Sequence, residues 1–429
     1  MKEINVAILG FGTVGQGTAK IIIDNASQWM KKCGADIKIR KVLVRNLNQK
    51  RMVDLPPGTL TDKWEDIIAD RDIQVVIEVM GGIEPAKKYI IEAISKGKNI
   101  ITANKDLLAD HGEEIFNAAN QYGVDVYFEA SVAGGIPIIM PLKKSLAANN
   151  ILQVMGIVNG TTNYILTKMS KEKMSYDEAL KRAQELGYAE ADPAADVGGY
   201  DAARKIAILA SIAFHTRVKL NDVFIEGITN LTARDIQFAQ ELGYAVKLLG
   251  IARENQGKIE VRVHPALISA NHPLANVNDS FNAVFVQGDA VGETMFFGRG
   301  AGQMPTASSV AGDLVSIANN IRNNSTGQLG CTCYEHKEIL SILEIHTKYY
   351  LRLYVVDRPG VLASIAGVFG ENGVSLASVL QKNSSPDNIA ELVVITHAVK
   401  ERDIQNALET IRNMPITKSI GNLIRVEEN

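Results

Sequence analysis

The chain has 429 residues and a net charge of −3, and 46% of its residues are apolar against 22% charged. This balance is typical of a globular protein of several domains, and it offers no basic excess to neutralise a nucleic acid or an anionic membrane. The N-terminus lacks the pattern of a signal peptide, and no apolar run approaches the roughly 20 residues that span a membrane. Three cysteines cannot all pair, which favours a reduced, cytoplasmic protein.

The first 140 residues alternate apolar strands with helices, which predicts a doubly wound parallel α/β sheet. Strands are expected over 6–9, 37–44, 75–79, 99–102 and 124–128, and helices include 85–96 and 112–122. The first strand runs directly into the turn Gly10-Phe11-Gly12-Thr13-Val14-Gly15, which opens a helix. Gly10 permits a tight turn, Gly12 lets a pyrophosphate approach, and Gly15 allows close packing. We therefore predict a Rossmann-type dinucleotide-binding domain over 1–140.

The end of the second strand bears on the choice between NAD and NADP. It reads Val44-Arg45-Asn46, with two more basic residues, Lys50 and Arg51, close behind. An arginine cannot accept hydrogen bonds from ribose hydroxyls but pairs well with a 2′-phosphate, so NADP is favoured. The alternative is that Arg45 is a solvated loop charge and that NAD is also used.

Residues 141–322 have a mixed α+β pattern, which predicts a substrate-binding, catalytic and dimerisation domain. Strands are expected over 151–158, 247–253, 258–263, 282–286 and 294–297, and helices over 175–187, 200–214 and 306–322. The first of these helices opens with the capping box Ser175-Tyr176-Asp177-Glu178. The segment 300–322 is expected to return to the nucleotide-binding domain.

A polar block lies in this middle region. Glu190, Asp192, Asp196 and Asp201 stand among glycines, which suits the binding of a substrate ammonium. Asp201 and Lys205 are four apart on a predicted helix and share a face. A lysine beside carboxylates and apolar surface can protonate a carbonyl oxygen as hydride reaches the carbon. The alternative is an ordinary surface ion pair on a helix.

Residues 346–429 form a small unit of their own, after a polar linker expected over 323–345. The predicted order of strand, helix, strand, strand, helix, strand is the ferredoxin-like arrangement. The first strand ends in Asp357-Arg358-Pro359-Gly360-Val361-Leu362, and Gly370-Glu371-Asn372 follows at the end of the helix. This unit resembles the ACT domain. The resemblance implies a regulatory amino-acid site with contributions from Asp357, Gly360, Val361, Leu362 and Asn372, and the alternative is a domain that only dimerises.

Nearly the whole chain resembles bacterial homoserine dehydrogenase. The stretches that carry the resemblance are the Gly10–Gly15 turn, Thr102–Lys105, Glu129–Pro137, Asn159–Leu166, Glu190–Lys205 and Gly298–Ala307. It implies that Lys205 is the proton donor and acceptor, that Lys105 assists, and that Glu190 and Asp201 hold the substrate ammonium. Further implied substrate contacts are Gly160, Thr161 and Asp196. Implied cofactor contacts are Phe11, Thr13, Val14, Arg45, Lys105 and Gly302. A monovalent cation, usually sodium, is implied at Glu129 through its side chain and at Val132, Gly134 and Ile136 through their carbonyl groups.

The resemblance also implies an activity and its partners. The expected reaction is the reversible NADPH-dependent reduction of L-aspartate 4-semialdehyde to L-homoserine, inhibited by an amino acid, with threonine the first candidate. A homodimer or homotetramer is expected. One rival is aspartate-semialdehyde dehydrogenase, but it needs a cysteine nucleophile, and Cys33 has no histidine near it in sequence. The other rival is a non-catalytic amino-acid sensor, which the presence of Lys105 and Lys205 disfavours.

Two smaller patterns, one of cysteines and one of histidines, are weaker indications of function. Cys331-Thr332-Cys333 with His336 does not fit the spacing of a structural zinc site, and we interpret these residues as linker or packing residues. His264 and His272 each precede a proline, which predicts loop positions.

Overall fold

The computed structural model describes residues 2–327, 330–382 and 388–428. The chain divides into two compact units, of three stretches each. The first unit contains Met1–Val154, Ala207–Asn221 and Asn282–His336, and the second contains Met155–Ile206, Asp222–Phe281 and Lys337–Asn429. Both β7 (Ile151–Ile157) and α8 (Tyr200–Ala213) run from one unit into the other along the chain. Residues 328 and 329 of the expected linker lie outside the described residues.

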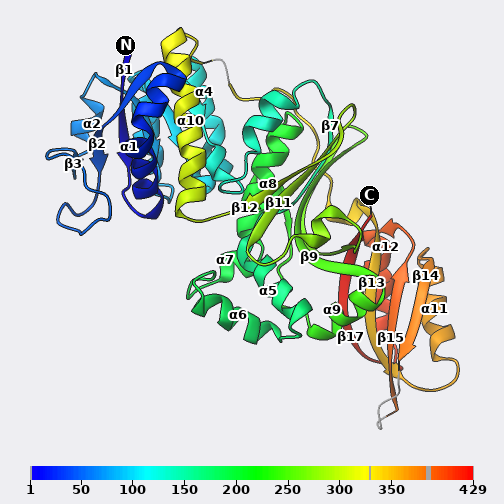
Figure 1. The fold of residues 1–429 in the computed structure, drawn as a ribbon. Helices are drawn as coiled ribbons and strands as arrows, with labels where there is room; N and C mark the ends of the chain where they lie inside the picture. The colour runs from blue at the N-terminus through cyan, green and yellow to red at the C-terminus, as the bar shows by residue number, and fades with distance from the viewer. Residues whose placement is uncertain (1, 328–329, 383–387, 429) are drawn as a thin grey trace. The chain divides into compact units, whose positions relative to one another are not determined.

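A parallel sheet of six strands forms the centre of the first unit (Figure 1). Its strands are β1 (Lys2–Leu9), β2 (Ala35–Leu43), β3 (Leu60–Thr61), β4 (Ile73–Glu78), β5 (Asn99–Thr102) and β6 (Val126–Tyr127). They lie in the order β3-β2-β1-β4-β5-β6, so the direction of chain order reverses beside β1. The carboxyl ends of β1, β4 and β5 therefore share one edge, where open parallel sheets bind their ligands.

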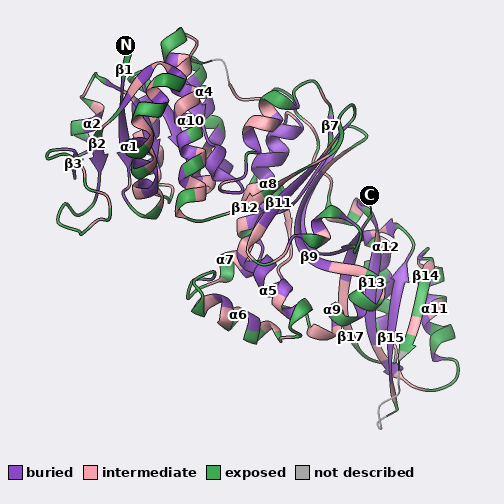
Figure 2. Cartoon of the chain, viewed as in Figure 1, coloured by how far each residue is buried: buried purple, intermediate pink, exposed green. Residues whose placement is uncertain are grey.

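Helices cover this sheet. They are α1 (Thr13–Cys33), α2 (Glu65–Ile68), α3 (Ala86–Ser95), α4 (Lys105–Tyr122) and α10 (Gln303–Asn323). α10 comes from late in the chain and lies beside α1 (Figure 1). Val310, Leu314 and Ile317 of α10 share one buried core with Ile8 of β1 and Ile22 of α1. The outer sides of both helices are exposed (Figure 2).

Two further strands of the first unit are β11 (Phe281–Gly288) and β12 (Gly292–Arg299), which are neighbours in a second sheet. β11 is mostly buried, whereas no residue of β12 is fully buried. Met295 and Phe297 of β12 are 41% and 54% exposed. Apolar side chains on an exposed strand mark a surface suited to association.

The second unit begins with helices and a long antiparallel pair of strands. Its elements before residue 337 are α5 (Gly160–Lys171), α6 (Tyr176–Glu185), α7 (Ala194–Val197), β8 (Phe224–Ile225), α9 (Ala233–Glu241), β9 (Tyr244–Asn255) and β10 (Lys258–Ser269). The capping box predicted at Ser175 and Glu178 is confirmed at the start of α6. A second capping box, Thr232 with Asp235, starts α9. β9 and β10 pair along their whole length.

The C-terminal part has the ferredoxin-like arrangement that the sequence predicts. Its elements are β13 (His346–Val356), α11 (Val361–Glu371), β14 (Leu376–Lys382), β15 (Ile389–Thr396), β16 (Val399–Lys400), α12 (Glu401–Arg412) and β17 (Thr417–Glu427). The four long strands lie in the order β17-β13-β15-β14. Leu351 and Leu353 of β13 face a core that α11 and α12 complete. The expected fold class is confirmed, with its Rossmann-type sheet, its α+β middle region and its ferredoxin-like C-terminal domain.

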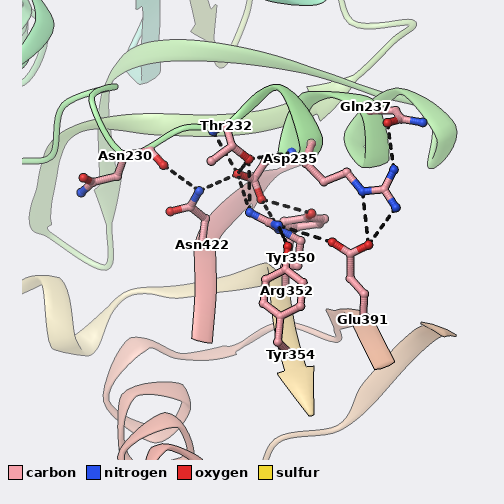
Figure 3. A network of polar contacts seen from close by, with 10 residues as sticks. Asn230, Thr232, Asp235, Gln237, Tyr350, Arg352, Tyr354, Glu391 and Asn422 are labelled. Carbon is pink, nitrogen blue, oxygen red and sulfur yellow. Dashed lines mark hydrogen bonds and ion pairs between the residues drawn. The ribbon is translucent and has the colours of Figure 1, made fainter. Parts of the chain in front are cut away.

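The opposite face of β13 carries polar side chains toward α9, since neighbours in a strand point to opposite sides. Arg352 donates to both carboxylate oxygens of Asp235, at 2.7 and 3.2 Å. Arg234 of α9 donates to Glu391 of β15 at 2.8 Å, and Figure 3 shows Glu391 in one network with Arg352 and Asp235. β17 also pairs in parallel with β10. The C-terminal sheet is therefore bound to the rest of the second unit through both backbone and side chains.

Three of the differences from the sequence predictions have a clear physical basis or affect a long element. α4 begins at Lys105, seven residues before the predicted start, because the Asn104 side chain accepts a hydrogen bond from the Leu107 amide. α9 was not predicted. The loop expected at His264 is wrong, because His264 and Pro265 lie inside β10 and His264 is completely buried.

Candidate functional site

The turn after β1 has the geometry of a dinucleotide-binding loop. α1 begins at Thr13, and Gly12 caps it without a side-chain hydrogen bond. Gly10 has a φ of +94°, and a Cβ on Gly15 would lie 2.2 Å from the Gly10 carbonyl oxygen, so neither position accepts a side chain. A Cβ on Gly12 would meet no atom within 4 Å. The uncapped helix start and the open space above Gly12 fit a pyrophosphate group.

The residues around this turn support it in different ways. Phe11 and Val14 belong to the core below the turn. Arg45, two residues after β2, is exposed and forms no ion pair with another described residue. Arg51 instead donates to three carbonyl oxygens of its own loop. Of these two arginines, Arg45 is therefore the one available to a phosphate group.

A network of buried hydrogen bonds precedes Lys105 at the ends of β4 and β5. Glu78, at the end of β4, is fully buried and accepts a hydrogen bond of 2.6 Å from the Thr102 hydroxyl. The Thr102 hydroxyl oxygen accepts from the Asn104 amide at 3.0 Å. Asn104 caps α4, so Lys105 is the first residue of that helix, at the carboxyl edge of the sheet. Burial raises the pKa of Glu78.

Sequence reasoning missed Glu78. The sequence signal for Glu78 is an acidic residue at the end of an apolar strand. A carboxylate buried in that position needs hydrogen-bond donors from the surrounding fold. Its role is to fix the ends of β4 and β5, and through Asn104 the position of Lys105.

Glu129 lies in a short 3-10 turn and is buried. Its carboxylate accepts hydrogen bonds from the backbone amides of Ile138, Ile139 and Met140. Its own amide donates to Asp313 of α10 at 2.9 Å. Burial, and then the nearby Glu129, raise the pKa of Asp313 well above its usual range, and burial also raises the pKa of Glu129. Neither carboxyl group forms an ion pair with another described residue.

The loop that follows Glu129 is tightly packed. Val132 and Ile136 are buried. The carbonyl oxygen of Gly134 accepts a hydrogen bond of 2.7 Å from the Ser309 hydroxyl. Gly302, which precedes Ser309 in the chain, is the N-cap of α10. Carboxylate and carbonyl oxygens are the ligands that hard cations prefer.

Lys205 lies at the centre of a compact polar cluster in the second unit. Its ammonium group donates to Asp201 and to the carbonyl oxygen of Val158, both at 2.7 Å. The Asn159 amide donates to Asp196 at 2.7 Å and to Asp201 at 2.8 Å. The side chains of Lys205 and Asp201 are only 12% and 13% exposed, so this pair is not the surface ion pair considered above. Burial raises the pKa of Asp196.

Asn159 is the second residue that sequence reasoning did not single out. Its side chain also accepts from the Thr162 amide, so the residue that caps α5 is the same one that gathers the two carboxylates. The signal was an asparagine directly before a helix start, which is a typical N-cap.

The other predicted substrate residues lie around this cluster. Gly160 is the first residue of α5. The Thr161 hydroxyl donates to the Tyr188 carbonyl oxygen at 2.6 Å, which ties α5 to the loop after α6. Glu190 is exposed in that loop, and its side chain makes no hydrogen bond with Asp196, Asp201 or Lys205. Glu190 thus lies outside the hydrogen-bonded cluster, and so does Asp192, whose carboxylate accepts from the Ala194 amide.

The predicted regulatory residues lie at the two ends of α11. Gly360 caps its start, Val361 is its first residue, and Leu362 is 41% exposed. Asp357 precedes them at the end of β13 and accepts from Gln381 at 3.4 Å. Asn372 caps the opposite end of this 11-residue helix, about 16 Å away at the usual helical rise. One copy of the domain therefore cannot bring Asp357 and Asn372 to the same small ligand.

Comparison with known proteins covers almost the whole chain. The pattern described as "Homoserine dehydrogenase, NAD binding domain" matches residues 10–129, "Homoserine dehydrogenase" matches 137–315, and "ACT domain" matches 349–415. The homoserine dehydrogenase of Bacillus subtilis is 48% identical over 430 residues, which are 100% of this chain and 99% of the relative. The crystal structure of the enzyme from Thiobacillus denitrificans has a TM-score of 0.94 at 41% identity and covers 100% of this chain. It matches over 99% of its own length.

The fold and the matched regions define an NAD(P)-dependent oxidoreductase with a C-terminal ACT domain. The chain belongs to the homoserine dehydrogenase family. A more distant relative, a hyperthermophilic archaeal homoserine dehydrogenase in complex with NADPH, has a TM-score of 0.61 at 26% identity over 73% of this chain and 97% of its own. Among the described residues, no helix is long and apolar enough to cross a membrane.

Proposed function

We propose that the chain catalyses the reversible, NADPH-dependent reduction of L-aspartate 4-semialdehyde to L-homoserine, on the route to threonine, methionine and isoleucine. The observation that carries this proposal is the position of the Lys205 ammonium group, which is nearly buried between Asp201 and the Val158 carbonyl group. A positioned lysine is well suited to exchange a proton with a substrate oxygen. The membership of the chain in the homoserine dehydrogenase family supports the same reaction.

In this mechanism Lys205 protonates the aldehyde oxygen. Two of its three N–H groups are accepted by Asp201 and Val158, so the third is left for the substrate. A nicotinamide cofactor held by the turn Gly10–Gly15 would supply the hydride for the aldehyde carbon. Lys105, fixed at the start of α4, assists at the reacting centre.

Carboxylates hold the other end of the substrate. Asp201 and Glu190 bind its ammonium group, and the Glu190 carboxylate is available because it is exposed and forms no ion pair with another described residue. Asp196, Gly160 and Thr161 provide further contacts. In the reverse direction Lys205 takes the hydroxyl proton of homoserine.

NADP is the preferred cofactor in this proposal, with NAD the alternative. The turn Gly10–Gly15 and the start of α1 bind the pyrophosphate, and Gly302 contacts the cofactor from α10. Arg45 is exposed at the end of β2 and pairs with the 2′-phosphate through charge-assisted hydrogen bonds. The NADPH complex of the archaeal relative supports this preference.

We also propose a monovalent cation, with sodium the first candidate, at Glu129, Val132, Gly134 and Ile136. Glu129 offers a carboxylate oxygen and the other three offer carbonyl oxygens. The support is the pair of buried carboxyl groups, Glu129 and Asp313, that lack a cationic partner among the described residues. Three amides already hold the Glu129 carboxylate, which leaves it about one free lone pair.

The ACT domain is proposed to bind an amino acid, with threonine the first candidate, and to lower the activity of the enzyme. The turn at Asp357, Gly360, Val361 and Leu362 would hold the ligand at the start of α11. Asn372 lies at the other end of that helix, so it takes part only if a second copy supplies it. Regulation also requires that the effector bind one state of the enzyme more tightly than the other.

A homodimer or homotetramer is proposed on the basis of β12. Met295 and Phe297 are exposed on this strand, and apolar residues on such a surface favour association.

We propose a cytoplasmic location because the three cysteines are free thiols, the state that reducing compartments maintain.

The test compares Lys205→Ala with Lys168→Ala. Lys168 pairs with Glu172 at 2.9 Å with the same spacing of four residues, so it is a matched control on a neighbouring helix. With aspartate semialdehyde as substrate and NADPH absorbance as readout, Lys205→Ala should lower kcat by about 100- to 10,000-fold. Lys168→Ala should leave it nearly unchanged. A Lys205→Ala enzyme that keeps more than about a tenth of the wild-type rate would refute the assignment.

A further inference from the structure

Cys331 and Cys333 have no role in the proposed reaction, yet their surroundings are specific. Both are free and partly exposed, and they line a small pocket of the first unit. The pocket has apolar walls that include Phe116, Phe128 and Ile208. Its free volume of about 30 Å³ holds little more than a water molecule. A reagent as small as hydrogen peroxide can therefore enter beside the two sulfur atoms.

The two sulfur atoms have different environments. Arg217 donates to Cys331 Sγ at 3.3 Å, and the Cys333 amide donates to the same sulfur at 3.4 Å. Cys333 Sγ instead lies 3.6 Å from the carbonyl oxygen of Ser211. The hydrogen bond from the Cys333 side chain, with help from Arg217, lowers the pKa of Cys331, and the same bond raises the pKa of Cys333. Cys331 is thus the nucleophile of the pair, and Cys333 keeps its proton.

The segment that carries the pair is fixed in place. The Glu335 amide donates to the His215 carbonyl oxygen at 2.8 Å, and the ring of Tyr334 stacks on His215 at 4.7 Å. Residues two apart are separated by at most about 7 Å, and a disulfide needs Cα atoms about 4.4–6.8 Å apart. A separation of two residues is therefore compatible with the Cα spacing of a disulfide.

Two other interpretations fit the site less well. A zinc site needs about four ligands, but no group of three His, Cys, Asp or Glu residues suited to a metal exists among the described residues. The second interpretation is that the cysteines are inert packing residues. That role suits Cys33, which is completely buried and donates to the Trp29 carbonyl oxygen at 3.0 Å. Cys331 differs from Cys33 because it is partly exposed and contacts an arginine, the setting of reactive cysteines.

We propose that Cys331 and Cys333 form a redox pair that hydrogen peroxide oxidises to an intramolecular disulfide. The Cys331 thiolate attacks one peroxide oxygen, the O–O bond breaks, hydroxide leaves and takes up a proton, and Cys331 becomes a sulfenic acid. The Cys333 sulfur then attacks the Cys331 sulfur, and the sulfenic hydroxyl leaves as water with the Cys333 proton. The peroxide gains the two electrons that the two thiols lose, and a dithiol reductant reverses the change.

Mass spectrometry of the full-length enzyme tests this. After treatment with hydrogen peroxide, the peptide with Cys331 and Cys333 should lose two hydrogen atoms and regain them with dithiothreitol. In Cys333→Ser, dimedone should trap a sulfenic acid on Cys331, and Cys331→Ser should give neither product. Cys33 is the internal control and should stay unmodified. Absence of the disulfide in the wild-type enzyme, or trapping on Cys33 as fast as on Cys331, would overturn the proposal.

The role of Arg217 is tested through alkylation by iodoacetamide. Arg217→Gln should slow alkylation of Cys331 at neutral pH by about tenfold, as expected for the loss of one charge-assisted hydrogen bond, and Arg217→Lys should restore much of the rate. The wild-type enzyme gives an independent measurement, because the midpoint of Cys331 alkylation against pH should lie below the usual thiol value of about 8.5. A midpoint at or above that value contradicts the assignment of Cys331 as the nucleophile.

Discussion

Removal of the Arg352 guanidinium group should loosen the C-terminal sheet from α9 far more than removal of that of Arg234. The two arginines belong to one network (Figure 3). Arg352 and its partner Asp235 are 6% and 0% exposed, whereas Arg234 is 40% exposed. Loss of one partner of a buried pair costs about 3–5 kcal/mol because the other charge stays buried. An exposed pair contributes only about 0–1 kcal/mol.

Amide hydrogen exchange of full-length Arg352→Met and Arg234→Met measures this difference. Exchange in α9 and β13 reports local opening, and at about 1.4 kcal/mol per tenfold the Arg352 change should accelerate it by roughly 100- to 5,000-fold. Arg234→Met should change the same peptides by less than about fivefold. Peptides from β1 and α1 should be unaffected in both variants. Equal acceleration in the two variants, or less than about tenfold for Arg352→Met, would mean that burial does not set the strength of this connection.

Three further predictions concern the cofactor, the effector and pH. Arg45→Ala should weaken NADPH binding by about 1.5–3 kcal/mol and NADH binding much less, by fluorescence titration; equal losses would show that Arg45 does not contact the 2′-phosphate. Asp357→Ala should raise the threonine concentration for half-inhibition at least several-fold, and an unchanged value would place the effector site elsewhere. Burial lowers the pKa of Lys247 from 10.5 to about 8, so the unfolded chain binds more protons between these values and stability should rise with pH across this window. Lys247→Met should reduce that rise, by as much as about 3 kcal/mol in urea unfolding, and identical slopes for both proteins would disprove the effect.

The elements predicted well from sequence are those that a short stretch of chain determines. The turn Gly10–Gly15 needs only its glycines, the strand before it and the helix after it. Asp201 and Lys205 were correctly placed on one face of a helix, because a spacing of four residues has the same consequence in any helix. The burial of that pair could not be predicted in this way, because it depends on Val158 and Asn159, more than 40 residues away.

β10 shows how tertiary pairing overrides a local signal. Pro265 has no amide hydrogen, which argued for a loop around His264. In the structure β10 pairs with β9 on one side throughout. On its other side β10 pairs with β8 at 262–263 and with β17 at 266–268. Pro265 lies between these two pairings, where a missing donor costs little.

The pairing of β10 with β17 has a consequence for how this enzyme could be rebuilt. Arg262 of β10 is completely buried, and it donates to Glu427, the last residue of β17, at 2.8 Å. A regulatory domain cut away near residue 340 would take with it both a strand and one of the two carboxylates that pair with that arginine. The ACT domain therefore cannot be exchanged as an independent unit. A different regulatory domain would also have to supply a strand that pairs with β10 and ends in an acidic residue. Without that strand, the catalytic part would expose an unpaired, aggregation-prone sheet edge.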